Sequence, residues 1–360
     1  MATLFDRLKV GQIELDNRMI MAPMTRSRAD NDGLQPTYAA EYYQQRASAG
    51  LIITEATNIS PMAKGYVRTP GIYSEAQIES WRPVARAVHA RGGKIFMQLF
   101  HTGRIALPDF LPNHTQPIAP SAVRAHGQNY TDAGMKEFVT PREISKEEIA
   151  QTVKDFATAS RNAIAAGFDG VELHAASGYL VQQFLTTNVN LRSDEYGGSI
   201  ENRTRFLFAV LDAMASEVGS QRVGVKLSPQ IAFNDIEERD ADEAYPYILE
   251  QLGERQLAYV HVSAGADWHS KLRSNYQGVY FAGARFTRDT GAELLAQGGA
   301  DAIVFGVKFL ANPDLPERFK RGAELNEPDQ ATFYSPGERG YLDYLTLEQG
   351  PALKDQKELT

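Results

Sequence analysis

The sequence predicts an α/β protein built as a single (β/α)8 barrel, and two observations support this fold. Eight short runs rich in Ile, Val, Leu, Phe and Met recur along the 360 residues, and stretches with helical periodicity lie between them. A run that is apolar throughout is typical of a parallel strand covered on both faces. The alternative, a doubly wound nucleotide-binding sheet, is disfavoured because no two glycines are spaced i, i+2, so the motif G-x-G-x-x-G is absent.

The predicted elements follow one another in strand–helix order. The strands are expected at Arg18–Met21, Gly50–Thr54, Lys94–Phe100, Gly170–His174, Val223–Leu227, Ala258–Ser263, Gly278–Ala282 and Asp301–Gly306. The helices are expected at Pro36–Ala49, Glu75–Arg91, Ser145–Ala166, Ile200–Val218, Ala241–Gln251 and Thr287–Gln297. Local signals mark several ends: Ser145 and Glu148 form a capping box, and Gly298-Gly299 follows the last of these helices.

One connection interrupts the alternation. Residues 103–144 contain several prolines and no helical period, which indicates a long insertion at about 104–143 after the third strand. Loops that follow barrel strands lie at the face where chemistry occurs, so the insertion is expected to act as a lid or substrate loop. A last helix is expected after residue 313, then a tail at about 333–360, all within one domain of residues 1–360.

Composition narrows the functional classes. The net charge of −8 disfavours nucleic-acid and anionic-membrane surfaces, which need a basic field. The chain has no cysteine, which excludes disulfides, thiolate metal sites and a cysteine nucleophile. No signal peptide and no apolar segment of membrane-spanning length are evident, so the expected location is cytoplasmic and the expected partner is a small molecule. The oligomeric state is left open.

The residues that follow the strands limit the chemistry further. They include no evident carboxylate pair for glycoside hydrolysis, no histidines at metal-binding i, i+4 spacing, and no G-x-S-x-G motif. Amide, hydroxyl, imidazole and phenol groups remain, a set that suits a planar hydrogen-bonding cofactor or an oxyanion. Small residues after the seventh and eighth strands fit the phosphate site that barrels commonly have there.

Several ordered motifs carry a family resemblance over nearly the whole chain. They are APMTR at 22–26, YYQQRA at 42–47, GLIITEA at 50–56, QLFHTGR at 98–104, GFDGVELH at 167–174, GYL at 178–180, RSDEYGGSIENR at 192–203 and ANPDL at 311–315. With these motifs the chain resembles the Old Yellow Enzyme family of FMN-dependent alkene reductases. The resemblance implies a ping-pong reaction in which NADPH or NADH reduces non-covalently bound FMN, and hydride then passes to the β-carbon of an enone, maleimide or nitro compound.

The resemblance also assigns roles to residues. His174 is expected to donate to the substrate oxygen, and Tyr179 to supply the proton to the α-carbon. Ser177 is a further expected donor, while Tyr66 and Phe100 are expected beside the substrate. The residues expected to bind the cofactor are Pro23, Met24, Thr25, Ala56, Gln98, Lys226, Gly283, Ala284, Arg285, Gly306 and Val307.

The chain departs from the family pattern within this site. Ser177 stands in place of the usual His or Asn, Lys226 replaces an Arg, and Phe100 often corresponds to Trp. Val307 replaces a phosphate-binding Arg, and Ala284 interrupts a glycine turn. In one interpretation Arg285 or Lys308 supplies the missing phosphate charge. In the alternative, FMN binding is weakened or lost and the barrel catalyses a redox-neutral isomerisation or cyclisation through Tyr179 and His174.

Two further histidines have structural interpretations. His101, in the QLFHTGR motif, is expected to make a structural hydrogen bond, and His261, on the sixth strand, is expected in the core.

Overall fold

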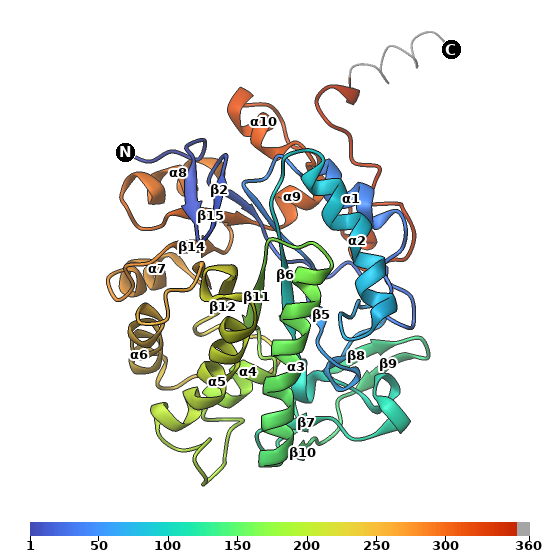
Figure 1. Cartoon of the computed structure of the whole chain (residues 1–360), viewed down its shortest axis with the longest axis vertical. Coiled ribbons are helices and arrows are strands. Elements are labelled where there is room, and N and C mark those ends of the chain that lie inside the picture. The colour runs from blue at the N-terminus through green and yellow to red at the C-terminus, as the bar shows by residue number, and fades with distance from the viewer. Residues whose placement is uncertain (351–360) are drawn as a thin grey trace.

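The computed structural model describes residues 1–350, and Figure 1 shows helices arranged around a central sheet. The pairing of the strands forms a closed barrel of eight parallel strands. Each strand pairs with the next, β15 pairs with β3, and β11 pairs with β6, which closes the ring. The barrel strands are β3 (Met19–Met21), β4 (Leu51–Ile53), β6 (Ile95–Phe100), β11 (Gly170–Ala175), β12 (Val223–Leu227), β13 (Tyr259–Ser263), β14 (Tyr280–Gly283) and β15 (Ala302–Phe305). All eight predicted strands are therefore confirmed. A short β5 (Thr57–Asn58) extends the sheet beside β6.

Helices surround the barrel. The six predicted helices are confirmed as α1 (Ala39–Gln45), α2 (Glu75–His89), α3 (Lys146–Ala165), α5 (Ile200–Val218), α6 (Ala241–Gly253) and α8 (Arg288–Ala296). The capping box at Ser145 and Glu148 is present, and the expected last helix is α10 (Leu315–Arg321). Three helices were not predicted: α4 (Leu180–Leu185), α7 (Ala266–Arg273) and α9 (Val307–Ala311). All are short, and every α4 side chain is buried, so α4 shows no amphipathic period.

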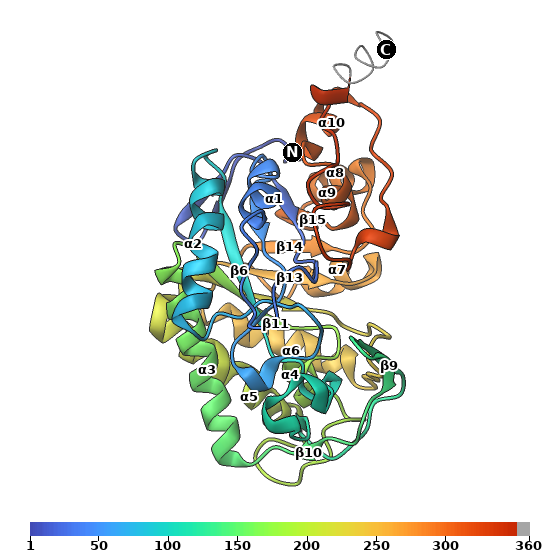
Figure 2. The same ribbon diagram turned by 90° about the vertical axis from the view of Figure 1, so that its right-hand side faces the viewer.

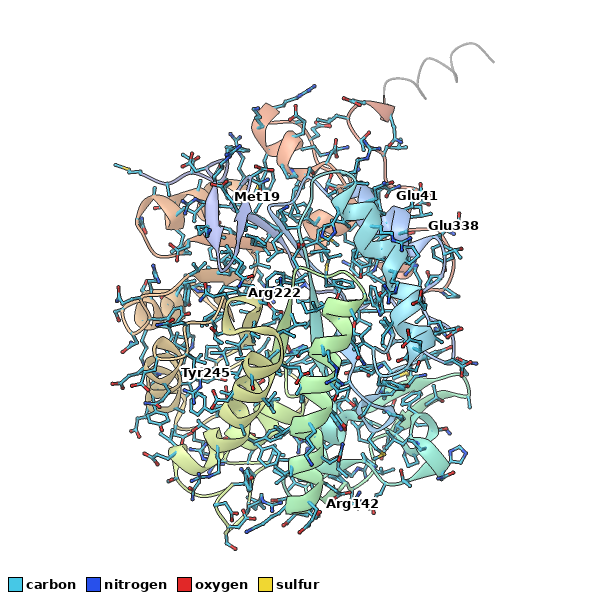
Figure 3. All side chains as sticks on the ribbon, in the orientation of Figure 1. Met19, Glu41, Arg142, Arg222, Tyr245 and Glu338 are labelled. Carbon is cyan, nitrogen blue, oxygen red and sulfur yellow. The ribbon has the colours of Figure 1, made fainter. Side chains whose placement is uncertain are left out.

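An N-terminal hairpin contributes to the barrel interior. Strands β1 (Leu8–Val10) and β2 (Ile13–Leu15) pair in antiparallel fashion, and their buried residues form one apolar cluster with residues of the barrel strands. Within that cluster the rings of Tyr259 and Phe281 stack at 4.2 Å between centroids. Every residue that forms this cluster is at most 5% exposed, so the barrel is a packed core rather than a pore. Met19 of β3, labelled in Figure 3, is likewise fully buried.

Close packing in this interior gives a stability prediction. A Cβ atom built on Gly224 of β12 would overlap the ring of Tyr259. We expect Gly224→Ala to lower the free energy of unfolding by about 1–3 kcal/mol, the usual cost of overpacking. Gly253→Ala is the matched control, because a Cβ at the end of α6 meets no atom within 4 Å. Equal urea midpoints for the two variants would contradict this packing.

The predicted insertion is confirmed after the third barrel strand, and it contains structure that the sequence did not indicate. Strand β7 (Ile118–Ala119) pairs with β10 (Arg142–Glu143), and β8 (Gln128–Thr131) forms a hairpin with β9 (Gly134–Glu137). Short 3-10 turns lie at Gly103–Ile105, Pro108–Phe110 and Pro112–His114. Asn129 of β8 donates to the Gly65 carbonyl at 2.6 Å, which fixes the hairpin beside the loop that follows β5.

The segment after α10 returns to the barrel (Figure 2). Arg26 donates to the carbonyls of Phe333 and Gly340, while Arg28 donates to those of Thr332, Phe333, Gly337 and Arg339. Tyr341 stacks on Tyr42 of α1 at 3.9 Å between ring centroids. The predicted tail is thus packed against the barrel as far as it is described, and its last ten residues lie outside the described ones.

Within residues 1–350, no helix is both long and apolar enough to cross a membrane.

Candidate active site

Three neighbouring cavities lie at the carboxyl ends of the barrel strands. The β14–β15 cavity, of about 590 Å³, shares Lys226 and Val307 with a central cavity of about 270 Å³. The central cavity shares Tyr179 and Tyr334 with an outer cavity of about 580 Å³. Together they form a continuous series of spaces at the face where barrel enzymes carry their chemistry.

The predicted site residues gather around these spaces. Those that line the central cavity are Pro23, Met24, Thr25, Ala56, Gln98, His174, Ser177, Tyr179, Lys226 and Val307. Those that line the β14–β15 cavity are Lys226, Gly283, Ala284, Arg285, Gly306 and Val307, together with Lys308. Tyr66 and Tyr179 line the outer cavity. Phe100 is placed differently: it is 1% exposed and packs behind His174 and Tyr179, with ring centroids at 6.2 and 5.5 Å.

His174 is a buried imidazole with an unsatisfied polar atom. Its side chain comes from β11 and lines the central cavity, the residue is 5% exposed, and its Nδ1 has no hydrogen-bond partner within residues 1–350. Burial, together with the charges of Lys226 and His261, holds the pKa of His174 well below 6.5. The ring is therefore neutral at pH 7, with one nitrogen able to donate and the other able to accept. An orphaned nitrogen in a cavity wall suits a ligand that carries the complementary polar atom.

Two tyrosines form a hydroxyl pair between the central and outer cavities. The Tyr66 and Tyr179 hydroxyls lie 3.0 Å apart, and their rings meet edge to face at 6.2 Å. Burial raises the pKa of Tyr66 to about 12 and holds the pKa of Tyr179 well above 10. Both phenols therefore keep their protons at neutral pH. The Tyr179 ring also lies 4.9 Å from the His174 ring, so a proton donor and an imidazole face one space.

A buried carboxylate connects residues from three strands beneath this space. Glu172 of β11 is fully buried, accepts from Nε2 of Gln98 at 2.7 Å, and lies 3.0 Å from Nδ1 of His261. The contact between Gln98 and Glu172 fixes the orientation of the Gln98 amide. Burial lowers the pKa of Lys226, and the negative charge of Glu172 acts in the opposite direction. His261 is buried, as predicted, and it also lines the β14–β15 cavity.

The turn after β14 places one cation, Arg285, at the β14–β15 cavity. Ala284 and Arg285 have φ angles of 104° and 58°, in the left-handed region that costs an L-residue about 1–2 kcal/mol. His269 of α7 lies behind the turn, with Nε2 3.2 Å from the Gly283 carbonyl oxygen. Arg285 of this turn and Lys308 of α9 both line the cavity, as expected if one of them supplies the phosphate charge that Val307 lacks. Three cationic residues, Lys226, Arg285 and Lys308, line this cavity against one acidic residue, Glu327, so its charge fits an anionic phosphate.

Some lining residues could not be found from the motifs. Phe233 comes from the loop after β12, and Tyr334 comes from the segment after α10; both line the central and outer cavities. Neither lies in a motif or a predicted strand end, and no local pattern indicates that these loops return to the site. His101, by contrast, makes the expected structural hydrogen bond, because its Nδ1 accepts from the Gly103 backbone N–H at 3.0 Å.

Comparisons with known proteins place the chain in a family. The model of the NADH:flavin oxidoreductase / NADH oxidase family matches residues 3–326. A probable flavin mononucleotide-dependent alkene reductase of Leishmania infantum is 45% identical over 349 residues, covering 94% of this chain and 95% of the relative. The 12-oxophytodienoate reductase 1 of Oryza sativa subsp. japonica is 43% identical, covering 95% and 92%.

Solved structures of similar enzymes share the fold of this chain. Morphinone reductase in complex with tetrahydroNAD superposes with a TM-score of 0.94 at 43% identity, covering 97% of this chain and 99% of that one. The old yellow enzyme homologue from Zymomonas mobilis has a TM-score of 0.94 at 38% identity, covering 96% and 100%. The chain belongs to the NADH:flavin oxidoreductase / NADH oxidase family, which confirms its resemblance to Old Yellow Enzyme. It is an NADH:flavin oxidoreductase, with FMN as cofactor and a nicotinamide nucleotide as reductant.

Proposed function

We propose that this protein is an ene-reductase that uses NADH or NADPH to reduce activated C=C bonds of enones, maleimides or nitro compounds. The observation that carries the proposal is the pairing of His174 and Tyr179 in one cavity wall. A neutral imidazole with an unsatisfied nitrogen lies beside a protonated phenol. Reduction of such an alkene needs one group to stabilise charge on the substrate oxygen and another to supply a proton.

The described residues fit FMN. Pro23, Met24, Thr25, Ala56, Gln98 and Lys226 would hold the ring in the central cavity, and Gly283, Ala284, Arg285, Gly306, Val307 and Lys308 would surround the phosphate. When bound, FMN supplies the hydride chemistry. Lys226 lines both cavities and places a positive charge where they meet. Arg285 and Lys308 at the β14–β15 cavity favour a bound FMN over the flavin-free alternative, because they offer positive charge where Val307 does not.

The chain's own residues account for the rest of the reaction. His174 donates a hydrogen bond to the carbonyl or nitro oxygen and stabilises the negative charge that develops there. Tyr179 holds a proton at its hydroxyl and donates it to the α-carbon, while Tyr66 fixes that hydroxyl from 3.0 Å. Ser177 offers a second, shorter donor in the central cavity. The central and outer cavities together suit a small molecule rather than a polymer.

The test is the visible absorption spectrum of the purified protein, recorded before and after incubation with FMN and desalting. We expect a flavin band that bleaches with NADH or NADPH under anaerobic conditions and returns when cyclohexenone is added. A protein that stays colourless after incubation would instead support the redox-neutral alternative. A band that bleaches but does not return with enone, maleimide or nitroalkene would contradict the ene-reductase proposal while leaving the flavin intact.

A further inference from the structure

The outer cavity has one charged residue among the described residues that line it, and that residue is Arg68. The remaining wall is aromatic, apolar or uncharged, with Tyr66 and Tyr179 at the end that adjoins the central cavity. The Arg68 side chain is 23% exposed. Arg68 also lines a neighbouring cavity of about 430 Å³, together with Lys64, Asp109 and Asp132. It therefore lies between this charged cavity and the mainly apolar outer cavity that connects with the His174–Tyr179 pair.

The local backbone holds Arg68 in this place. Its φ of 53° is left-handed, a conformation uncommon for a residue with a long side chain. The Ala29 backbone N–H donates to the Arg68 carbonyl at 3.1 Å, and Nε of Arg68 donates to the Ser27 carbonyl at 3.2 Å. Both the backbone and the side chain of Arg68 are thus tied to residues 27–29, so the guanidinium is held at a defined point of the wall.

The counterion of Arg68 is easily displaced. The guanidinium donates from Nη1 to Oδ1 of Asp132 at 3.2 Å, and that carboxylate lies in the turn between β8 and β9 with 71% of its side chain exposed. Ion pairs with an exposed partner contribute little to stability. An anion held in the outer cavity by its apolar part would compete with Asp132 for the guanidinium, whose planar fork suits carboxylate and phosphate oxygens.

We propose that Arg68 is an anion-recognition residue of the outer cavity. Molecules that use this cavity would carry a carboxylate or phosphate remote from the end that reaches Tyr179, joined by an apolar body. This inference rests on the proposed function and deepens it. The anion has two sources, an alkene substrate that is itself an acid or the phosphates of the nicotinamide nucleotide, and separate half-reactions distinguish them.

The first measurement concerns the alkene. Dithionite-reduced protein is mixed in a stopped-flow instrument with 3-(3-oxocyclohex-1-enyl)propanoate or with its methyl ester, and flavin reoxidation is followed. The ratio of the two second-order rate constants, acid over ester, isolates the contribution of the charge. If the substrate is the source, we expect Arg68→Gln to lower this ratio about tenfold, the usual size of a charged hydrogen bond.

The second measurement concerns the reductant. Oxidised protein is mixed anaerobically with NADH or with 1-benzyl-1,4-dihydronicotinamide, which has no phosphates, and flavin bleaching is followed. If the dinucleotide is the source, we expect Arg68→Gln to lower the ratio of NADH to benzyl analogue about tenfold.

Two further variants keep the test decisive. Asp132→Asn removes the competing carboxylate, so it should raise the same ratio that Arg68→Gln lowers, and it needs no change in the cavity wall. Lys136→Gln is the matched control, because Lys136 lies on β9 of the same hairpin and pairs with Asp109 outside the outer cavity. It removes an equal charge and should leave both ratios unchanged.

Each outcome has a defined meaning. A fall in one ratio with Arg68→Gln and a rise with Asp132→Asn support the proposal and identify the source. Unchanged ratios in both variants, or equal falls with Lys136→Gln, overturn it, because the charge then acts nowhere or only at long range. If the wild-type flavin neither bleaches with either reductant nor reoxidises with either alkene, the proposed function fails, and that result is distinct from unchanged ratios in an active enzyme.

Discussion

Tyr179→Phe should retain flavin reduction by NADH and lose alkene reduction. The proposed proton donor acts after the reductant has left, so the bleaching rate should stay within a few-fold of the wild type. The reoxidation rate with cyclohexenone should fall by about 10²–10⁴-fold, the usual contribution of general acid catalysis. Stopped-flow absorbance separates the two half-reactions. Equal losses in both, or none in reoxidation, would contradict the assignment of Tyr179.

Tyr66→Phe is the matched control, because it removes a hydroxyl from the same pair and leaves the Tyr179 proton in place. Its reoxidation rate should fall far less.

The pH dependence of the reoxidation rate follows from the pKa shifts of Tyr66, Tyr179 and His174. Raised pKa values keep the phenols protonated below about pH 10, and the lowered pKa of His174 keeps its imidazole neutral from well below pH 6.5 upward. The reoxidation rate should therefore be flat between pH 6.5 and 9.

Arg285→Ala, alone and with Lys308→Ala, should weaken FMN binding without weakening riboflavin binding. Both cations line the β14–β15 cavity, and only FMN carries a phosphate. Each lost charged hydrogen bond should raise the dissociation constant of FMN about 10–100-fold. Titration of apoprotein with each flavin, followed by quenching of flavin fluorescence, measures the difference.

Arg288→Ala is the control for this pair, since Arg288 begins α8 three residues after Arg285 and is absent from the described lining of the β14–β15 cavity. Unchanged FMN affinity in the double variant would show that these cations do not replace the guanidinium missing at Val307. Equal weakening for FMN and riboflavin would show damage to the turn instead, because riboflavin has no phosphate to lose.

Periodicity sufficed to predict the barrel because each strand is buried on both faces and each long helix on one. All eight strands, from Arg18–Met21 to Asp301–Gly306, could therefore be placed. The same argument fails for α4, whose side chains are all buried, and for α7, whose eight residues contain few apolar positions. Helices of this kind are stabilised by their surroundings, which no local pattern encodes.

Residues of the candidate site were predictable where a motif ends a strand. His174, Gln98 and Lys226 project from strands, so the barrel itself brings them together. Phe233 and Tyr334 reach the cavities from loops, and long-range contacts place those loops. Two buried arginines, Arg26 and Arg28, bind carbonyls more than 300 positions away in sequence, and such a pairing cannot be inferred from either partner alone.

The arginine contacts to the segment after α10 have a consequence for how the protein is made. The barrel has all eight strands once residue 305 has emerged from the ribosome, yet the outer cavity still lacks the wall formed by Ala331, Tyr334, Ser335 and Pro336. All barrel strands are therefore synthesised before one wall of the outer cavity. Until residues 332–340 follow, the buried guanidinium groups of Arg26 and Arg28 lack the carbonyl partners that this segment supplies, so closure of the outer cavity and pairing of these two arginines occur together.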